Sequence, residues 1–188
     1  MHLEQSKLEV RYSGVGITRL GQKHTEIQYR KDFVSTNLGS GQSTFSNAVQ
    51  SMKAWHHFAM DWIHLFPENP AMDPNTTLLV CANHRVFWSV NACKIIDVID
   101  ESSESTKRFG YSYGTLPQHV EQGEELFLLE WDLVSDRVTY SILAYSKPNH
   151  PLVAIFWPVA GLIQDYFRKQ SLLALKNSLE NPRLLKSH

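Results

Sequence analysis

Three stretches between residues 109 and 144 alternate large apolar residues with small or polar ones at a period of two. Their large residues are Phe109, Tyr111 and Tyr113, then Phe127, Leu129, Trp131 and Leu133, then Val138, Tyr140, Ile142 and Ala144. Side chains of a β-strand point alternately to its two faces, so this pattern predicts strands with one buried face. The short VSDR segment predicts a hairpin, and short connections favour an antiparallel sheet.

Further strands and two helices are expected around this block. TTLLVCANHRVF and FWSVNACKIIDVID predict two strands divided near Asn83 or His84, and weaker strand patterns occur around Tyr12 and over residues 24–34. The glycine- and serine-rich NLGSGQS segment predicts a turn. Apolar spacing then predicts a helix over residues 44–63 and a longer helix over residues 156–174, ended by Asn181 and Pro182.

This order of elements constrains the architecture. A long helix with one apolar stripe, following an antiparallel sheet, is expected to cover the concave face of that sheet. We therefore predict an α+β helix-grip fold, in which a curved antiparallel sheet wraps around the C-terminal helix and leaves a cavity between them. A chain of 188 residues fits one domain, so residues 1–188 are expected to form it, with an N-terminal segment at 1–23 and a flexible tail at 183–188.

Composition excludes several classes of partner. The formal net charge is −1, which argues against a nucleic-acid partner, because such proteins carry a clustered basic face. The apolar run PLVAIFWPVAGLI is short and interrupted by Pro158, so no membrane span is expected. The first residues lack a secretory leader and Cys81 and Cys93 form no CxxC pair, which predicts a cytoplasmic protein with free thiols.

Histidines in HHFAMDWIH invite a metal interpretation, which the spacing does not favour. His57 and His64 are two helical turns apart, too far to share one ion, and no HExxH motif is present. We interpret these histidines as residues of a polar helix face and expect neither a metal nor a cofactor.

The segment FGYSYGTLPQHVEQGEELFLLEW holds the candidate catalytic residues. By the two-residue period, Glu125 shares a face with Phe127, and Glu124 points the other way unless a bulge at Gly123 changes the parity. Glu125 and the turn residue His119 are candidate general bases. The alternative is structural, in which the carboxylate braces the turn through backbone N–H groups.

Polar groups on the inward rows of the sheet and on the last helix are candidates for holding a ligand. Tyrosine and tryptophan place polar tips inside an apolar hollow, which can orient a bound molecule. The candidate ligand-binding residues are Tyr111, Tyr113, Thr115, His119, Glu125, Trp131, Tyr140 and Tyr166.

The segment YGTLPQHVEQGEELF resembles the signature of a family found in plants and bacteria, a domain of unknown function. Shorter pieces support the resemblance: YSGVG, LGSGQSTF, YSILAYSKP and PVAGLIQDYF. The family is grouped with the START-like, pollen-allergen-like superfamily of helix-grip proteins. The resemblance implies that fold and a cavity for an apolar ligand, and it implies no catalytic residues.

Three kinds of function remain open at this point. The first is a binding protein for a lipid-like or aromatic small molecule, oriented by Tyr113, His119 and Glu125. The second is a cyclase- or hydrolase-like enzyme on the same scaffold, with Glu125 or His119 as general acid or base. The third is an interaction module whose cavity is filled by its own side chains.

Overall fold

The computed structural model describes residues 9–10, 12–21, 28–117, 119, 121–149 and 157–180, with side chains for all of these except residues 157–160. Seven antiparallel strands of this part form one sheet in the order β1-β7-β6-β5-β4-β3-β2. The strands are β1 (Arg30–Ser40), β2 (Ile63–Phe66), β3 (Thr77–Asn83), β4 (Trp88–Ser102), β5 (Thr106–Thr115), β6 (Glu121–Asp132) and β7 (Arg137–Pro148). The helices are α2 (Ile17–Leu20), α3 (Gly41–Lys53), the 3-10 turn η2 (His56–Phe58) and α5 (Trp157–Glu180).

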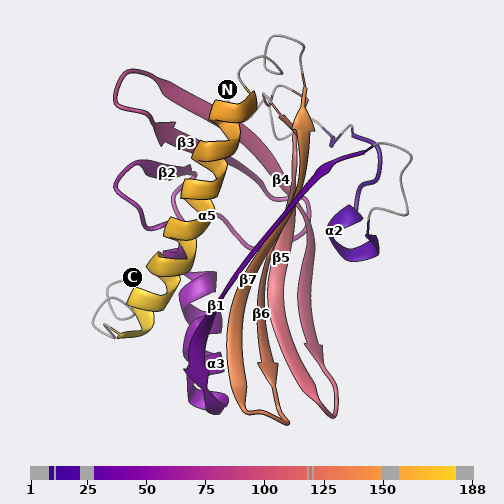
Figure 1. Ribbon diagram of the computed structural model, residues 1–188, viewed down its shortest axis with the longest axis vertical. Helices are drawn as coiled ribbons and strands as arrows, with labels where there is room; N and C mark the ends of the chain where they lie inside the picture. The colour runs from indigo at the N-terminus through magenta and orange to yellow at the C-terminus, as the bar shows by residue number, and fades with distance from the viewer. Residues whose placement is uncertain are drawn as a thin grey trace.

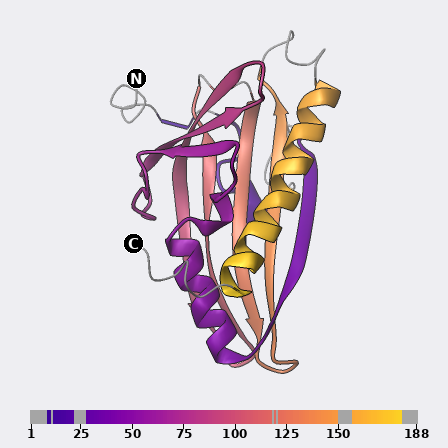
Figure 2. The same cartoon turned by 90° about the vertical axis from the view of Figure 1, so that its left-hand side faces the viewer.

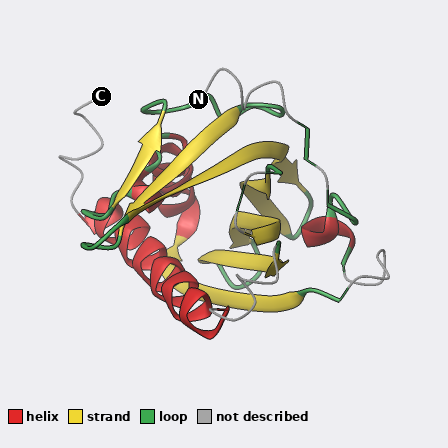
Figure 3. Cartoon of the chain, turned by 90° about the horizontal axis from the view of Figure 1, so that it is seen from above, coloured by secondary structure: helices red, strands yellow, loops and turns green. Residues whose placement is uncertain are grey.

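The sheet is strongly curved, and its two faces are covered by different elements. Helices α5 and α3 lie on the concave side, whereas the short α2 lies on the opposite side (Figures 1 and 2). The view from above shows the strands of the curved sheet with the long helix running along its open side (Figure 3). This arrangement confirms the predicted α+β helix-grip fold. The expected tail at 183–188 lies outside the described residues.

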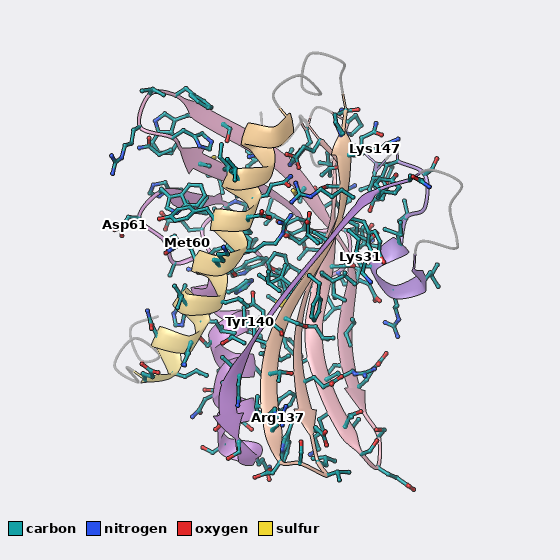
Figure 4. The ribbon with its side chains drawn as sticks, in the orientation of Figure 1. Lys31, Met60, Asp61, Arg137, Tyr140 and Lys147 are labelled. Carbon is teal, nitrogen blue, oxygen red and sulfur yellow. The ribbon has the colours of Figure 1, made fainter. Side chains whose placement is uncertain are left out.

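The core lies where α3, η2 and the C-terminal half of α5 meet the lower concave face, which is the part of the sheet nearer the β6–β7 hairpin in Figure 1. Tyr111, Phe127 and Tyr140 come from three neighbouring strands and are completely buried, and the first two rings stack at 5.1 Å. The Tyr140 hydroxyl lies 3.0 Å from the Ser171 hydroxyl of α5, so the aromatic row also contacts the helix (Figure 4). The alternating rows of the sequence therefore form the buried face, as predicted.

Strand boundaries in the second half of the chain confirm the predictions, and the first strand corrects one. β3 and β4 are separated at residues 84–87, and β6 and β7 form the expected hairpin. β1 continues to Ser40 through the segment predicted to be a turn. The register shifts between Asn37 and Gly39, where the Asn37 side chain accepts a hydrogen bond from the Gly39 N–H. Turn-type residues here make a β-bulge within a strand.

Helix α3 is ten residues shorter at its C-terminal end than predicted, because it ends at Lys53 and not at residue 63. Trp55 adopts a left-handed conformation with φ 60°, and its indole N–H donates to the Pro70 carbonyl at 2.8 Å. The apolar residues that continued the helical spacing belong to other elements, since Ile63 begins β2. Spacing alone does not distinguish these cases, because a buried turn and a buried strand are also apolar.

The N-terminal segment also differs from its prediction. Around Tyr12 the chain makes turns followed by α2, which packs on the convex face of β6 and β7. Glu124, only 3% exposed, accepts hydrogen bonds from the Tyr12 hydroxyl at 2.9 Å, from the Gly16 N–H at 2.7 Å and from the Thr18 N–H at 3.2 Å. Gly114 leaves room for this contact, since an added Cβ would lie 2.4 Å from the Tyr12 oxygen.

His57 is a second correction, since the structure buries it completely and does not place it on a polar face. Its Nε2 lies 2.6 Å from the Tyr111 hydroxyl, and its ring stacks on Trp55 at 5.5 Å. Burial, with a smaller contribution from His56, lowers the pKa of His57 to about 3. The ring is therefore neutral in the folded protein over the whole physiological range.

In no part of the chain that the structure describes is there a helix both long and apolar enough to cross a membrane.

Replacement of Glu124 by Gln should loosen the N-terminal segment. The variant loses the charge that the three donors named above and the Thr18 hydroxyl share, and it places an amide N–H₂ group among donors. We therefore expect the free energy of unfolding to fall by about 1–3 kcal/mol. Amide hydrogen exchange at Gly16 and Thr18 should accelerate. Glu130→Gln, on the same face of β6, is the matched control. Unchanged exchange at Gly16 in Glu124→Gln would contradict the anchoring role.

The buried His57 should make stability fall in acid. Its pKa is lower in the folded than in the unfolded chain, so its contribution is complete above pH 6.5 and is lost as the pH falls toward 3. Between pH 7 and pH 5 the wild-type protein should lose roughly 2 kcal/mol more stability than His57→Gln does. Urea denaturation at the two pH values measures this, with the exposed His64→Gln as control. Equal losses in all three proteins would show that His57 does not titrate on unfolding.

Candidate functional site

A pocket of about 620 Å³ lies between the upper concave face of the sheet and the N-terminal half of α5. Apolar residues of β3 and α5 face each other across it, including Val80, Ala82, Ile163 and Phe167. Its other wall is the start of β6 with the neighbouring ends of β5 and β7, where the side chains are polar. The pocket is thus apolar along β3 and at Ile163 and Phe167 of α5, and polar where β6 begins, where Gln164 and Arg168 of α5 also line it.

The pocket brings together four of the eight predicted ligand-binding residues. Tyr113, Thr115, His119 and Glu125 all line it. They come from β5, β6 and the turn between them, which is the segment that the sequence indicated. The two-residue period of β6 holds through Gly123, where the register to β7 continues without a bulge, so Glu125 faces the pocket side and Glu124 the opposite side.

The other four predicted residues lie outside the pocket wall. Tyr111 and Tyr140 are in the filled core below it, and Trp131 is near the far end of β6, where its ring lies 6.0 Å from that of Phe45. Tyr166 is 54% exposed on α5, with its ring 5.6 Å from that of Trp62. Side chains therefore occupy the lower half of the concave face, and open space is confined to the upper half.

Glu125 is held by two partners, one from the sheet and one from the helix. Its carboxylate accepts a hydrogen bond from the Tyr113 hydroxyl at 2.7 Å and one from Arg168 Nε at 3.2 Å. Arg168 is 2% exposed and also contacts Asp165 at 2.8 Å and Asp32 at 3.3 Å. These bonds already engage both oxygens of Glu125. They fit a carboxylate that fixes geometry better than one that collects a proton from a substrate.

The sequence analysis did not identify Arg168. Its neighbours on the helical stripe are apolar, and a lone arginine on a helix is usually a solvated residue. The available signal was its spacing of three and seven residues from Ser171 and Leu175, which places the three on one helix face, and that face is buried.

Glu121 is the second residue that the sequence analysis did not identify. Its carboxylate accepts a hydrogen bond from the Gln164 side chain of α5 and lines the pocket. Burial is the main cause that raises the pKa of the Glu121 carboxyl to about 7, and the negative charge of Glu125 raises it further. The Gln164 hydrogen bond and the positive charges of Arg168 and Arg30 lower this pKa. Glu121 thus has both protonation states accessible near neutral pH, which is the property sought in a general acid or base.

His119 lies beside Glu121 and is neutral. Its Nδ1 accepts a hydrogen bond from the Glu121 backbone N–H at 3.0 Å, so the ring proton is on Nε2. Burial is the main cause that lowers the pKa of His119 to about 4. The imidazole therefore presents an N–H donor at neutral pH and not a positive charge.

Comparison with known proteins identifies the relatives of this chain. A UPF0548 protein of Dictyostelium discoideum is 34% identical over 143 residues, which are 72% of this chain and 66% of that protein. A UPF0548 protein of Arabidopsis thaliana is 30% identical over 169 residues, or 86% and 81% of the two chains. Among solved structures, a hypothetical protein of Helicobacter pylori aligns with a TM-score of 0.52 at 13% identity, covering 90% of this chain and 95% of its own, which supports the fold alone.

Residues 11–174 match the family described as "Domain of unknown function (DUF1990)". This match covers most of the chain and includes every element from α2 through most of α5. The chain therefore belongs to the DUF1990 family.

Proposed function

We propose that this protein is a START-like binding protein that holds an apolar or aromatic small molecule in the pocket between α5 and the upper concave face of the sheet. The pocket volume of about 620 Å³ lies within the range of roughly 300–1,000 Å³ found for small-molecule sites. Apolar side chains of β3 and α5 suit the body of such a ligand, and the polar start of β6 suits one polar end.

One observation carries the proposal. Among the described residues, the buried side-chain atoms without a hydrogen-bond partner include His57 Nδ1 in the filled core and, in residues that line this pocket, Ser146 Oγ and Trp62 Nε1. Native proteins leave few buried polar atoms unpaired, because each costs about 1–3 kcal/mol. A ligand with a polar group in the pocket could satisfy Ser146 Oγ and Trp62 Nε1, whereas His57 Nδ1 lies in the core away from the pocket lining.

An acid–base enzyme is the second candidate, favoured by Glu121. A carboxyl group with a pKa of about 7 next to the neutral His119 is suited to proton transfer at neutral pH. In this case Glu121, and not Glu125, is the general base. The two candidates differ in what happens to the bound compound: a binding protein releases it unchanged, and an enzyme releases a product.

Native mass spectrometry of the freshly purified protein tests the occupancy of the pocket. A binding protein should retain a stoichiometric small-molecule adduct that denaturing extraction releases for identification. The identified compound is then incubated with the purified protein: its recovery unchanged supports binding, and recovery of a product supports the enzyme.

Narrowing the pocket should weaken binding without unfolding the protein. Ile163 lines the pocket, whereas the adjacent Leu162 is 70% exposed on the same helix. Ile163→Trp should weaken binding of the neutral dye Nile red by roughly tenfold or more, since the indole takes up ligand volume, and Leu162→Trp should leave it unchanged. Fluorescence titration measures the dissociation constants, and circular dichroism checks the fold. Equal affinity in the two variants would place the dye site elsewhere and contradict the proposal.

A further inference from the structure

The charged side chains around the polar end of the pocket include more carboxylates than arginines. Glu121, Glu125, Asp32 and Asp165 are carboxylates, and Arg30 and Arg168 are the arginines among them. Both arginines contact Asp32 and Asp165, and Arg168 also contacts Glu125. Among the side chains described, no lysine or arginine lies within ion-pair distance of Glu121, which pairs with the neutral amide of Gln164. Glu121 is therefore a carboxylate without a direct cationic partner.

A hydroxyl without a partner lies near Glu121 on the neighbouring strand. Gly123 follows Glu121 by two residues on β6, and β7 runs so close there that an added Cβ would lie 2.0 Å from the Tyr145 carbonyl oxygen. Opposite Gly123 in β7 is Ser146, which is 7% exposed, lines the pocket and has no partner for its hydroxyl in the described chain. On the other side, the Thr115 hydroxyl of β5 accepts a hydrogen bond from the Gly123 N–H at 3.0 Å. The wall thus presents a carboxylate and an unpaired hydroxyl around a glycine.

We propose that the ligand of this pocket carries a protonated amine, which the Glu121 carboxylate and the Ser146 hydroxyl bind over Gly123. This inference rests on the proposed binding function and specifies its ligand. An ammonium group has three donors and no acceptor, which matches two acceptors in a net acidic surrounding. The nearby rings of Tyr113 and Phe167 also line the pocket, and ring faces attract cations. An anionic ligand would meet the excess of carboxylates.

The pH dependence of binding follows from the groups that face Glu121. These groups are Gln164 and Arg168 from α5, Arg30 from β1, Glu125 from β6 and the neutral His119. The pKa of Glu121, raised by burial to about 7, means that the free pocket holds a neutral carboxyl below this pH and a carboxylate above it. An aliphatic amine has a pKa near that of lysine, about 10.4, and stays protonated in both ranges. Its affinity should therefore rise between pH 6 and pH 8.

Octylamine, octanol and octanoate test the inference, because they share one apolar chain and differ only in the polar group. Each competes with Nile red for the purified full chain at pH 6 and pH 8. We expect octylamine to bind roughly tenfold or more tightly than octanol at pH 8, with a smaller advantage at pH 6. Glu121→Gln should abolish the advantage and Ser146→Ala should reduce it. Glu130→Gln, on the opposite face of β6, should keep it.

Three results would overturn the inference: equal affinity for amine and alcohol, preference for octanoate, or an amine preference that persists in Glu121→Gln. The pH comparison within the wild-type protein keeps the test decisive if a variant does not fold. Failure of the binding function itself is distinguishable, because Nile red and octanol would then not bind at all.

Discussion

The buried guanidinium of Arg168 determines where α5 lies on the sheet. It joins the helix to Glu125 in β6 and to Asp32 in β1, and both partners lie on the concave face. A charge this deeply buried is costly unless it is fully paired, so removal of either carboxylate leaves an uncompensated ion. Buried ion pairs of this kind specify geometry more than they add stability. The opening of the pocket beside the helix therefore depends on this contact.

β6 holds elements on both faces of the sheet through two adjacent carboxylates. Glu124 fixes the N-terminal segment on the convex face, and Glu125 fixes Arg168 on the concave face. Their opposite directions follow from the two-residue period of a strand. The structural interpretation that the sequence analysis considered for Glu125, bracing of the chain through backbone N–H groups, describes Glu124 in the structure. Glu125 acts through side chains.

Sequence reasoning succeeded where a regular period sets the structure. The inward rows of β5, β6 and β7 and the opposed directions of Glu124 and Glu125 all follow from alternation. It failed where a local conformation or a distant partner decides. The end of α3 depends on the left-handed Trp55 and its bond to Pro70, and the importance of Arg168 depends on carboxylates from two other elements.

The candidate site shows the same division. Tyr113, Thr115, His119 and Glu125 were singled out as candidates because they occupy one local segment, and all four line one pocket. Glu121 was not identified, because its altered proton affinity arises from burial under α5, which no local pattern reports. Tyr111 and Tyr140 satisfied the inward pattern equally well but lie in the half of the concave face that side chains fill.

The strand order has a consequence for how the protein reaches this structure. β1 pairs only with β7 within the sheet. The backbone of Arg30 can therefore pair with that of Ser146, its opposite residue in the register, only after nearly all of the other strands have been synthesised. Pairings between such distant segments pay a large loop-closure entropy and form slowly. Until β7 arrives, the first strand has unpaired backbone groups that other chains can recognise. The last hairpin therefore completes the sheet and covers one edge of β1, whose other edge is the border of the finished sheet.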